Sequence, residues 1–399
     1  MTARRHPLFI AVTQGLLIGV AATAVAGDPI QPGPDFVVNS IADDGDGVCE
    51  AALGSCTLRD AIDAANGDPD LSVVSFDPAV FDGPVTLTLT QGDLVIDESI
   101  TVSGPGANLL TIDAEFQSRH FHFVGGGTTN RLSGMRLIRG NGNAGTPDPG
   151  ERGGAIRTVA ALTLDVMILS NNQARAGGGL WSISSDVEIS NSTLTGNRAG
   201  NRGGALYARG NELTLRNTTI SGNRMNGPLN GLGSGIELNR ASLNVLDSTV
   251  SDNEAPNSDG GASIAIVAGS ADVRLERSII SAGGDLDLAG NGDFELDHAL
   301  VQNPGEVNIT LDNRSITGVD PLLAELNDNG GPTPTRALLF NSPAVDAGGT
   351  GCPALDQRGE PRPFDGNGTG AALCDIGAFE AQQINADFPE IIFSDRFEG

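Results

Sequence analysis

One phrase returns five times in the middle of this 399-residue chain, and its length limits the possible fold more than any other feature. Each copy holds short alternating strands, an Asn, a polar turn and a Gly-rich turn. With the Asn as register mark, the copies fall at Asn141, Asn172, Asn197, Asn223 and Asn253, spaced 25 to 31 residues apart. Repeats of this length with period-2 strands and no helical pattern are typical of solenoids. The sequence therefore predicts an all-β fold, a parallel β-helix in which each copy forms one coil.

The apolar residues of the repeat fall into three columns. The first contains alternating pairs, the second follows each pair, and the third follows the glycines. They are Leu162/Leu164, Val187/Ile189, Leu213/Leu215, Leu243/Val245 and Val273/Leu275; Ile138, Leu169, Leu194, Ile220, Val250 and Ile280; and Ile156, Leu180, Leu206 and Ile236. Alternation turns one face of each strand inward, so stacked coils bury every column. We expect the Asn residues to stack amide on amide at a tight corner with left-handed backbone geometry.

The first 26 residues have the pattern of a secretory signal. Arg4 and Arg5 precede an uncharged run over residues 8–25, and Ala24-Val25-Ala26 provides a small-x-small cleavage site. The run is also nearly long enough for an uncleaved anchor helix, but its polar content favours cleavage. We therefore expect a mature chain that begins at Gly27 and has no membrane span.

The cysteine pattern agrees with export. Cys49 lies near Cys56 in the sequence, and Cys352 lies near Cys374. In an oxidising compartment this spacing predicts two local disulfides, one near each end of the chain. Four cysteines allow three pairings, and four free thiols are the remaining alternative.

Two terminal segments resemble known domains. Residues 36–49 and 56–66 resemble the CSLREA domain of secreted bacterial proteins, with Thr57 in place of Ser and Asp60 in place of Glu. A second resemblance, to the choice-of-anchor Q domain, rests on Asp320-Pro-Leu-Leu, Asp328-Asn-Gly-Gly-Pro, Asn341-Ser-Pro-Ala-Val-Asp, Asp356-Gln-Arg-Gly and Asp375-Ile-Gly-Ala-Phe-Glu. The resemblance implies a right-handed parallel β-helix of the pectin-lyase-like class, secreted by or held on the surface of a Gram-negative-type bacterium. It implies no known reaction.

These observations divide the chain into a signal peptide (1–26), an N-terminal cap (27–70), the β-helix repeats (71–319), a C-terminal cap (320–382) and a tail (383–399). Thr57 and Asp60 form a capping-box pattern, after which Leu58, Ile62 and Ala65 lie on one apolar face of a short helix. Such a helix can cover the open edge of the first coil. The C-terminal segment loses the repeat, and we expect it to cap the other end of a monomer.

Charge is distributed unevenly along the chain. The formal net charge of −27 argues against nucleic acid and anionic membranes as partners, yet residues 131–240 contain twelve arginines and seven acidic residues. Arg152 and Arg202 precede Gly-Gly turns, whereas Arg198 and Arg224 follow the register Asn. Stacked coils place such residues in basic columns suited to a polyanionic chain. The alternative is that they are solvated turn residues.

The only Trp and the only Tyr occupy equivalent positions in neighbouring coils. The residues after the inward aliphatic side chains are, in chain order, Arg157, Trp181, Tyr207, Glu237 and Ile264. Pleating turns them outward and coils stack about 4.8 Å apart, so the two rings are predicted to form an exposed platform beside Arg157. An aromatic surface flanked by charge is suited to sugar rings. The alternative is packing between coils, or cover by the loop 142–151.

Acidic residues on a Gly-rich loop predict a calcium site. Asp43, Asp44, Asp46 and Glu50 provide the hard oxygen ligands that calcium prefers, although their spacing is not that of an EF-hand. A solvated acidic turn is the alternative. A weaker candidate of the same kind contains Asp365, Asn367 and Asp375, and the pair His120 and His122 has no third ligand and is expected to be structural.

Catalysis has little support in the sequence. Asp165 and Glu188 project from neighbouring coils with no evident partner, and the paired carboxylates of a hydrolase are not recognisable. We therefore predict an exported, non-catalytic β-helix protein that binds an acidic polysaccharide through its two rings and its arginines. The alternatives are a polysaccharide lyase or glycoside hydrolase on the same fold, and a purely structural, adhesin-like surface protein.

Overall fold

The computed structural model describes residues 32–382, except 50–54, 144–150, 228–232, 258–260, 270 and 283–285. The predicted signal peptide (1–26), the tail (383–399) and Glu50 lie outside the described residues. Within the part of the chain that is described, no helix is both long and apolar enough to cross a membrane.

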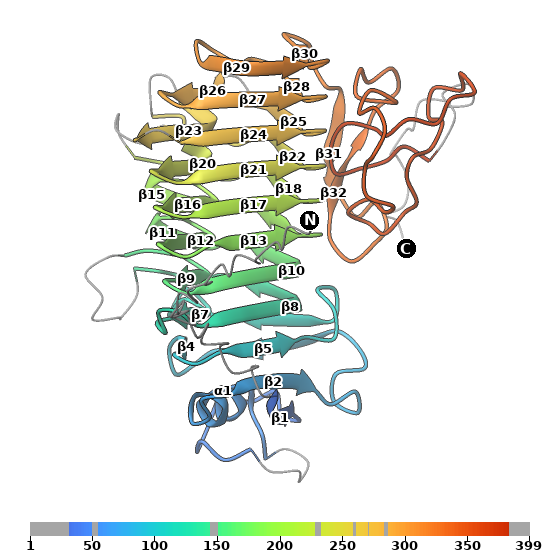
Figure 1. Cartoon of the computed structure of the whole chain (residues 1–399). Helices are drawn as coiled ribbons and strands as arrows, with labels where there is room; N and C mark the ends of the chain where they lie inside the picture. Colours follow the sequence, from blue (N-terminus) through green and yellow to red (C-terminus); the bar gives the residue numbers. More distant parts are fainter. Residues whose placement is uncertain are drawn as a thin grey trace, which may run out of the picture. The chain divides into compact units, whose positions relative to one another are not determined.

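Parallel strands stacked coil upon coil form the body of the structure (Figure 1). The first column consists of β1 (Pro32–Val38), β2 (Leu71–Phe76), β5 (Ile100–Ser103), β8 (Thr129–Ile138), β10 (Ala161–Ser170), β13 (Val187–Ser190), β17 (Glu212–Arg216), β21 (Ser242–Leu246), β24 (Asp272–Glu276), β27 (Asp293–Asp297) and β29 (Asn308–Asn313). The second consists of β3 (Val85–Thr88), β6 (Leu110–Asp113), the ends of β8 and β10, β14 (Thr193–Thr195), β18 (Thr219–Ser221), β22 (Thr249–Ser251), β25 (Ile279–Ser281), β28 (Leu300–Val301) and β30 (Ile316–Thr317). Both columns belong to one sheet.

Two further sheets complete the coils. The eight-stranded sheet consists of β4 (Leu94–Ile96), β7 (Phe121–Phe123), β9 (Ile156–Thr158), β12 (Leu180–Ile183), β16 (Leu206–Arg209), β20 (Gly233–Asn239), β23 (Ala262–Ala268) and β26 (Leu286–Gly290). A short sheet contains β11 (Gln173–Ala176), β15 (Arg198–Arg202) and β19 (Arg224–Met225). The predicted parallel β-helix is confirmed.

The predicted apolar columns line the interior. Side chains of the first column pair in register from coil to coil and are fully buried, as Leu164, Ile189 and Leu215 illustrate. The third column behaves in the same way, with Ile156, Leu180 and Leu206 in register. Backbone groups of each strand pair with the coils on either side, so no coil buries its inner face alone.

The Asn ladder is buried and hydrogen-bonded. Nδ2 of Asn172 donates to Oδ1 of Asn197 at 3.0 Å, and the same contact joins Asn197 to Asn223 and Asn223 to Asn253, both at 2.9 Å. The left-handed backbone, however, falls on the residue before the Asn, for example Gly196 (φ 65°). The amide stack was therefore predicted correctly, but the left-handed backbone position was predicted one residue too late in the sequence.

The first copy of the repeat was aligned one residue out of register. Leu137 rather than Ile138 continues the second apolar column, and Asn141 lies one residue beyond the ladder. Gly140 occupies the ladder position. A Cβ atom there would lie 2.8 Å from the buried ring of His120, so that ring takes the space that an Asn side chain would need.

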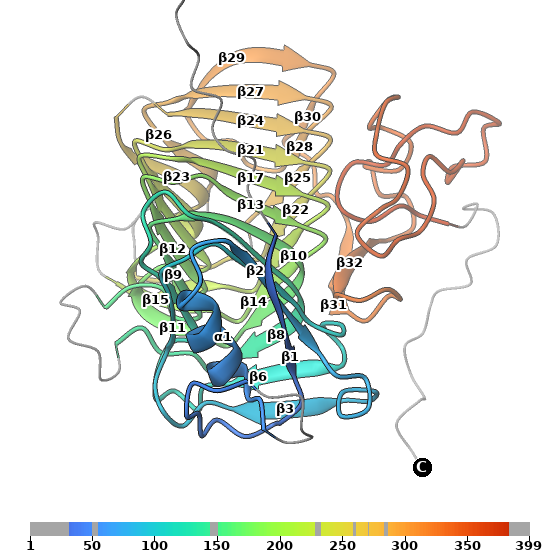
Figure 2. The same cartoon turned by 60° about the horizontal axis from the view of Figure 1, so that its bottom comes forward.

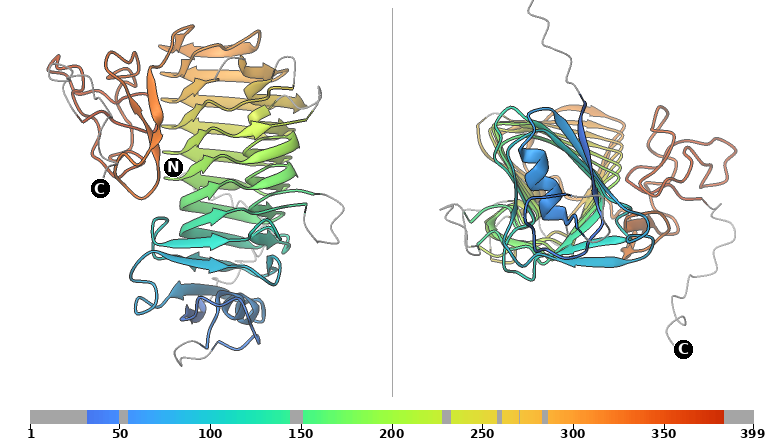
Figure 3. Two further views of the ribbon diagram at one scale, coloured as in Figure 1. Left: turned by 180° about the vertical axis from the view of Figure 1, so that it is seen from behind. Right: turned by 90° about the horizontal axis from the view of Figure 1, so that it is seen from below.

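A short helix covers the first coils, as the sequence predicted (Figures 2 and 3). Helix α1 (Leu58–Asn66) begins at a capping box between Thr57 and Asp60. Its face containing Leu58, Ile62 and Ala65 is buried in the main core. Burial of this apolar face and satisfaction of the first helical N–H groups explain why so short a helix forms here.

The C-terminal segment is irregular, as predicted, but it packs along the side of the solenoid. Beyond the antiparallel pair β31 (Leu323–Asn327) and β32 (Thr335–Leu338), little regular structure is present up to residue 382. Figures 1 and 3 show this segment beside the stacked strands. Arg336 donates to Ser251 Oγ at 3.2 Å, and the Ala378 amide donates to Thr249 Oγ1 at 3.1 Å. At the end of the solenoid, all six residues of β29 are exposed.

Buried carboxylates organise this irregular segment. Asp375 accepts hydrogen bonds from the backbone amides of Asp346 and Ala381, at 2.7 and 2.6 Å. Glu380 accepts from the amides of Phe364 and Asp375, at 2.8 and 3.0 Å. These oxygens replace the strand partners that a chain without regular structure lacks, which gives the acidic motifs of this region a structural role.

Both predicted disulfides are present. Cys49 bonds to Cys56 beside α1, and Cys352 bonds to Cys374 within the C-terminal segment. The bonded cysteines are 7 and 22 residues apart in the sequence, so the predicted local pairing is confirmed.

Candidate ligand-binding cleft

Trp181 and Tyr207 stack on the outer surface of the eight-stranded sheet. They pair in register on β12 and β16, and their rings lie 7° from parallel with centroids 6.5 Å apart. Together with Ala176 they form a small apolar cluster that is separate from the main core. The prediction that pleating turns both rings outward from neighbouring coils is therefore confirmed. The register also corrects one position, since Ala265 rather than Ile264 follows Glu237 in this column.

The rings are not an exposed platform. Trp181 is 3% exposed and Tyr207 is 6% exposed. The guanidinium carbons of Arg152 and Arg157 lie 4.9 and 5.3 Å from the Trp181 ring centroid, and that of Arg202 lies 5.9 Å from the Tyr207 centroid. Cations favour the faces of aromatic rings, so the arginines occupy the surface on which a sugar was expected to stack. The rings instead hold the arginines in place.

Gly-rich turns bring the arginines to the rings. Arg152, Ala176 and Arg202 are equivalent residues of successive coils, each directly before a Gly. In the last of these turns Gly203 has a φ of 55°, and a Cβ atom there would lie 2.0 Å from the carbonyl oxygen of Leu206. Only Gly tolerates this turn. The turn folds the chain back, so that Arg202, which precedes it, lies over the ring of Tyr207, the second residue of β16.

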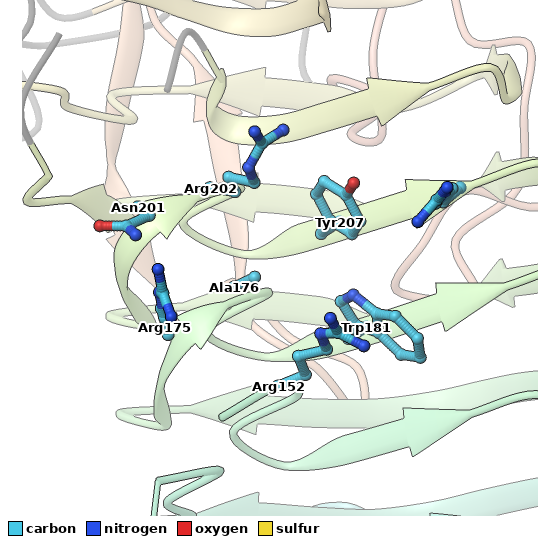
Figure 4. Close-up of a pocket in the computed structure, with 8 residues that line it drawn as sticks. Arg152, Arg175, Ala176, Trp181, Asn201, Arg202 and Tyr207 are labelled. Atoms are coloured by element: carbon cyan, nitrogen blue, oxygen red, sulfur yellow. The ribbon is translucent and has the colours of Figure 1, made fainter. Parts of the chain in front are cut away.

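A cleft opens between these turns and the rings (Figure 4). Its volume is about 230 Å³. The lining residues are Arg152, Arg175, Ala176, Trp181, Asn201, Arg202, Tyr207 and Arg209. Four guanidinium groups therefore meet in one small space, and none of the described lining residues is acidic.

The predicted platform residues separate into three groups. The cleft is lined by four of them: Arg152, Trp181, Arg202 and Tyr207. Arg157 packs against the Trp181 ring but is not part of the lining of the cleft. The other two predicted residues, Arg198 and Arg224, pair in register on β15 and β19 outside the lining. Arg198 and Arg224 thus stack directly as one basic column, whereas Ala176 separates Arg152 from Arg202 in the other.

Sequence reasoning missed Arg175, Asn201 and Arg209. Arg175 and Asn201 both precede a Gly-rich turn by two residues, which is a signal that the repeat contains. With its amide oxygen turned toward Arg175, Asn201 accepts a hydrogen bond from Nε of that side chain at 3.0 Å. Arg209 lies at the end of β16, and the sequence carries no sign that its side chain reaches the same space.

Polar side chains continue the column beyond the rings on both sides. On one side Arg157 Nη1 lies 3.1 Å from His122 Nε2, and His122 Nδ1 lies 3.5 Å from Asp93. On the other side Arg202 Nη1 donates to Oε1 of Glu237 at 3.0 Å. Glu237 is fully buried, and burial raises its pKa to about 7 despite the opposing charge of Arg202.

The predicted calcium ligands have other partners or are apart. Asp43 is buried and accepts hydrogen bonds from Arg59 Nε and the Gln91 amide, both at 2.9 Å, so its carboxylate oxygens already have protein partners. Asp44 and Asp46 are exposed. Across the described residues, no three His, Cys, Asp or Glu side chains gather closely enough to hold a metal.

The second acidic loop and the histidine pair are also occupied by structural contacts. Asp365 accepts from the amides of Thr369 and Gly370, at 3.0 and 2.7 Å. His120 is fully buried, its Nε2 lies 3.0 Å from the carbonyl oxygens of Ile112 and Ile138, and burial lowers its pKa to about 4. His120 is therefore neutral and structural, as expected.

The two acids singled out on the long sheet have partners after all. Asp165 accepts a hydrogen bond from Arg131 at 2.7 Å and another from Ser190 at 2.8 Å. Glu188 pairs with Arg216 at 3.4 Å. The partners lie on neighbouring coils and far away in the sequence, which is why the sequence showed these acids as isolated.

The family comparison agrees with this architecture. Residues 152–319 match the family model described as a right handed beta helix region. This part of the chain is a right-handed parallel β-helix. The β-helix includes the whole described lining of the cleft, from Arg152 to Arg209. The crystal structure of pectate lyase Pel9A is similar to this chain at 14% identity and a TM-score of 0.39, with 88% of this chain and 97% of that chain covered. No curated protein matches this chain.

Proposed function

We propose that this chain binds an acidic polysaccharide in the cleft beside Trp181 and Tyr207. The observation that carries the proposal is the lining, where four guanidinium groups meet two aromatic side chains. In a chain with a formal net charge of −27, a local excess of positive charge attracts a negatively charged partner.

The lining side chains suit an acidic sugar. Guanidinium groups are planar, always charged and suited to bidentate hydrogen bonds with carboxylates. Trp181 and Tyr207 belong to the lining and hold the guanidinium groups of Arg152 and Arg202 beside the space that a sugar would occupy. Because Arg152 and Arg202 are two coils apart, roughly 10 Å, a chain with acidic groups at regular spacing can meet both.

The proposal is binding without turnover. The lining consists of four arginines, two aromatic residues, one Asn and one Ala, whereas glycoside hydrolysis uses a pair of carboxyl groups at a defined separation. A polysaccharide lyase and a purely structural surface protein are the other functions on this fold, and the experiment below separates them from the proposed one.

We further infer that the protein acts outside the cytoplasm, as the resemblance to CSLREA and choice-of-anchor Q proteins implies. The two disulfides support this inference, because disulfides persist mainly in oxidising compartments.

Titration of the full chain with short sugars tests the proposal. The probes are pentamers of galacturonate and mannuronate, with a neutral glucose pentamer and a single-stranded DNA pentamer as comparisons. Binding is followed by calorimetry and by emission of Trp181, the only Trp of the chain. We expect blue emission before addition, because Trp181 is buried, and a saturable, salt-sensitive change with a uronate pentamer only. Binding of DNA alone, or of no probe, contradicts the proposal.

Matched arginine variants place the sugar. Arg152→Gln and Arg202→Gln are expected to weaken uronate binding roughly tenfold or more, since each removes a charge-assisted hydrogen bond. Arg274→Gln is the control, because Arg274 pairs with Glu276 at 2.6 Å on β24, away from the cleft. Equal loss in the control contradicts the proposed location. New absorbance from unsaturated uronides during the titration identifies a lyase instead of a binding protein.

A further inference from the structure

Glu237 occupies the next step of the column that contains the two rings. It pairs in register with Tyr207 on one side and with Ala265 on the other. Its side chain is fully buried, and a Cβ atom on Gly233 would lie 2.8 Å from the Glu237 Cβ. The carboxylate is therefore enclosed beside the cleft without being part of its lining.

Arg202 is shared between Glu237 and the cleft. Its Nη1 donates to Glu237 Oε1 at 3.0 Å, while its side chain remains 40% exposed and lines the cleft. The other carboxylate oxygen, Oε2, has no hydrogen-bond partner among the described residues. The ionised carboxylate is thus stabilised by one cation and by the backbone amides of Gly203 and Gly233, and that cation is also available to a ligand.

The charged groups around Glu237 can be named strand by strand. Tyr207 faces it from β16, on which Arg209 pairs in register with Asn239. Arg202 reaches it from β15, on which Arg198 pairs in register with Arg224. Arg224 is the charged residue of β19, and it lies 3.6 Å from Glu254. The sequence of β23 contains no charged residue. Arg202 is therefore the principal counter-charge of Glu237.

We propose that Glu237 competes with an anionic ligand for Arg202, so that the cleft binds an acidic sugar more tightly once Glu237 is protonated. The inference rests on the proposed function. An ionised Glu237 neutralises Arg202 and repels a carboxylate that approaches it. Protonation removes both effects and leaves all four guanidinium charges to the ligand. Because burial raises the pKa of Glu237 to about 7, affinity increases as the pH falls through neutrality.

Calorimetry of the full chain with the galacturonate and mannuronate pentamers at pH 5.5, 7.0 and 8.5 tests the proposal. The salt concentration is kept constant, and the carboxylates of both probes stay ionised throughout. We expect binding by the wild type to be about tenfold tighter at pH 5.5 than at pH 8.5. Glu237→Gln should bind at every pH as tightly as the wild type does at pH 5.5.

Two controls exclude general effects of charge and of other titrating groups. Glu188→Gln removes one charge from the long sheet, where Glu188 pairs with Arg216, and should keep the wild-type pH profile. His122→Gln removes the histidine beside Arg157 and should keep it too. Arg202→Gln removes the cation for which Glu237 and the ligand compete. This variant should bind the uronate weakly and with no dependence on pH. This variant tests the proposal even if Glu237→Gln does not fold.

The possible failures are distinguishable. If the wild type binds a uronate with the same affinity at all three pH values, or if Glu237→Gln retains the wild-type profile, the role of Glu237 is wrong and the proposed function stands. If neither pentamer binds at any pH, the proposed function itself is wrong. A profile lost in His122→Gln assigns the titration to His122 and overturns the proposal.

Discussion

Nε2 of Gln357 donates a hydrogen bond to Oγ1 of Thr193 at 3.0 Å, across 164 residues of sequence. The Oε1 of the same amide accepts from Thr219 Oγ1 at 2.7 Å. Thr193 and Thr219 pair in register on neighbouring coils, so one buried amide joins the C-terminal segment to two coils. This contact gives the Asp356-Gln-Arg-Gly motif a physical reason.

Gln357→Ala is expected to loosen the C-terminal segment from the solenoid. The change leaves several buried hydroxyl and carbonyl groups without their partner and should lower the free energy of unfolding by about 2–4 kcal/mol. Denaturant titration measures the loss, and proteolysis within residues 323–382 locates it. Gln382→Ala is the control, since its side-chain amide donates to the Pro361 carbonyl oxygen in an exposed contact. Unchanged proteolysis in Gln357→Ala contradicts the prediction.

Asn197→Ala should interrupt the ladder. The Asn197 side chain donates to Leu169 and Asn223 and accepts from the Asn172 amide at 3.1 Å, all in a buried corner. Its removal is expected to cost about 2–3 kcal/mol of stability. Asn141→Ala, which changes the one register Asn outside the ladder, should cost less than about 1 kcal/mol. Thermal unfolding measures the loss of stability in each variant. Similar losses in Asn197→Ala and Asn141→Ala would contradict the prediction.

Removal of the Cys352–Cys374 disulfide should destabilise the C-terminal segment. The bond closes a loop of 22 residues, which the chain-entropy account values at about 3 kcal/mol. Replacement of both cysteines by Ser is therefore expected to increase hydrogen exchange in this segment. Exchange in β13 and β17 serves as the internal reference and should stay slow. Equal exchange in the segment with and without the bond contradicts this prediction.

The C-terminal segment should also lose stability as the pH rises. Burial, together with the nearby carboxylate of Glu380, raises the pKa of Asp375 to about 8. The folded state then binds a proton more tightly than the unfolded state does, so this contribution is complete below about pH 4 and is lost as the pH rises through 8. Denaturant midpoints at pH 5, 7 and 9 should fall in the wild type and fall less steeply in Asp375→Asn. A parallel fall in both proteins assigns the effect to other groups.

Much of the fold follows from local pattern. Period-2 alternation at Leu162 and Leu164, repeated every coil, identifies the inner face without knowledge of any contact. The capping box at Thr57 identifies the helix for the same reason, because a cap and its first turn are adjacent in sequence. The first coil was misaligned because Gly140 stands where the other coils have the ladder Asn. The His120 ring fills the space of the missing side chain, and a contact between residues 20 positions apart cannot be read from the repeat.

The sequence by itself determined the β-helix, its inward columns, the stack of Trp181 on Tyr207 and the two disulfides, because each depends on spacing that repetition or proximity makes regular. Only the tertiary structure decided that arginines cover the rings, that Arg175 and Arg209 reach the same cleft, and that Asp43 pairs with Arg59. The physical reason is that long polar side chains take their direction from partners on other coils and turns. A repeat predicts the position of each Cα atom, whereas the position of a charged group at the end of a long side chain depends on tertiary contacts.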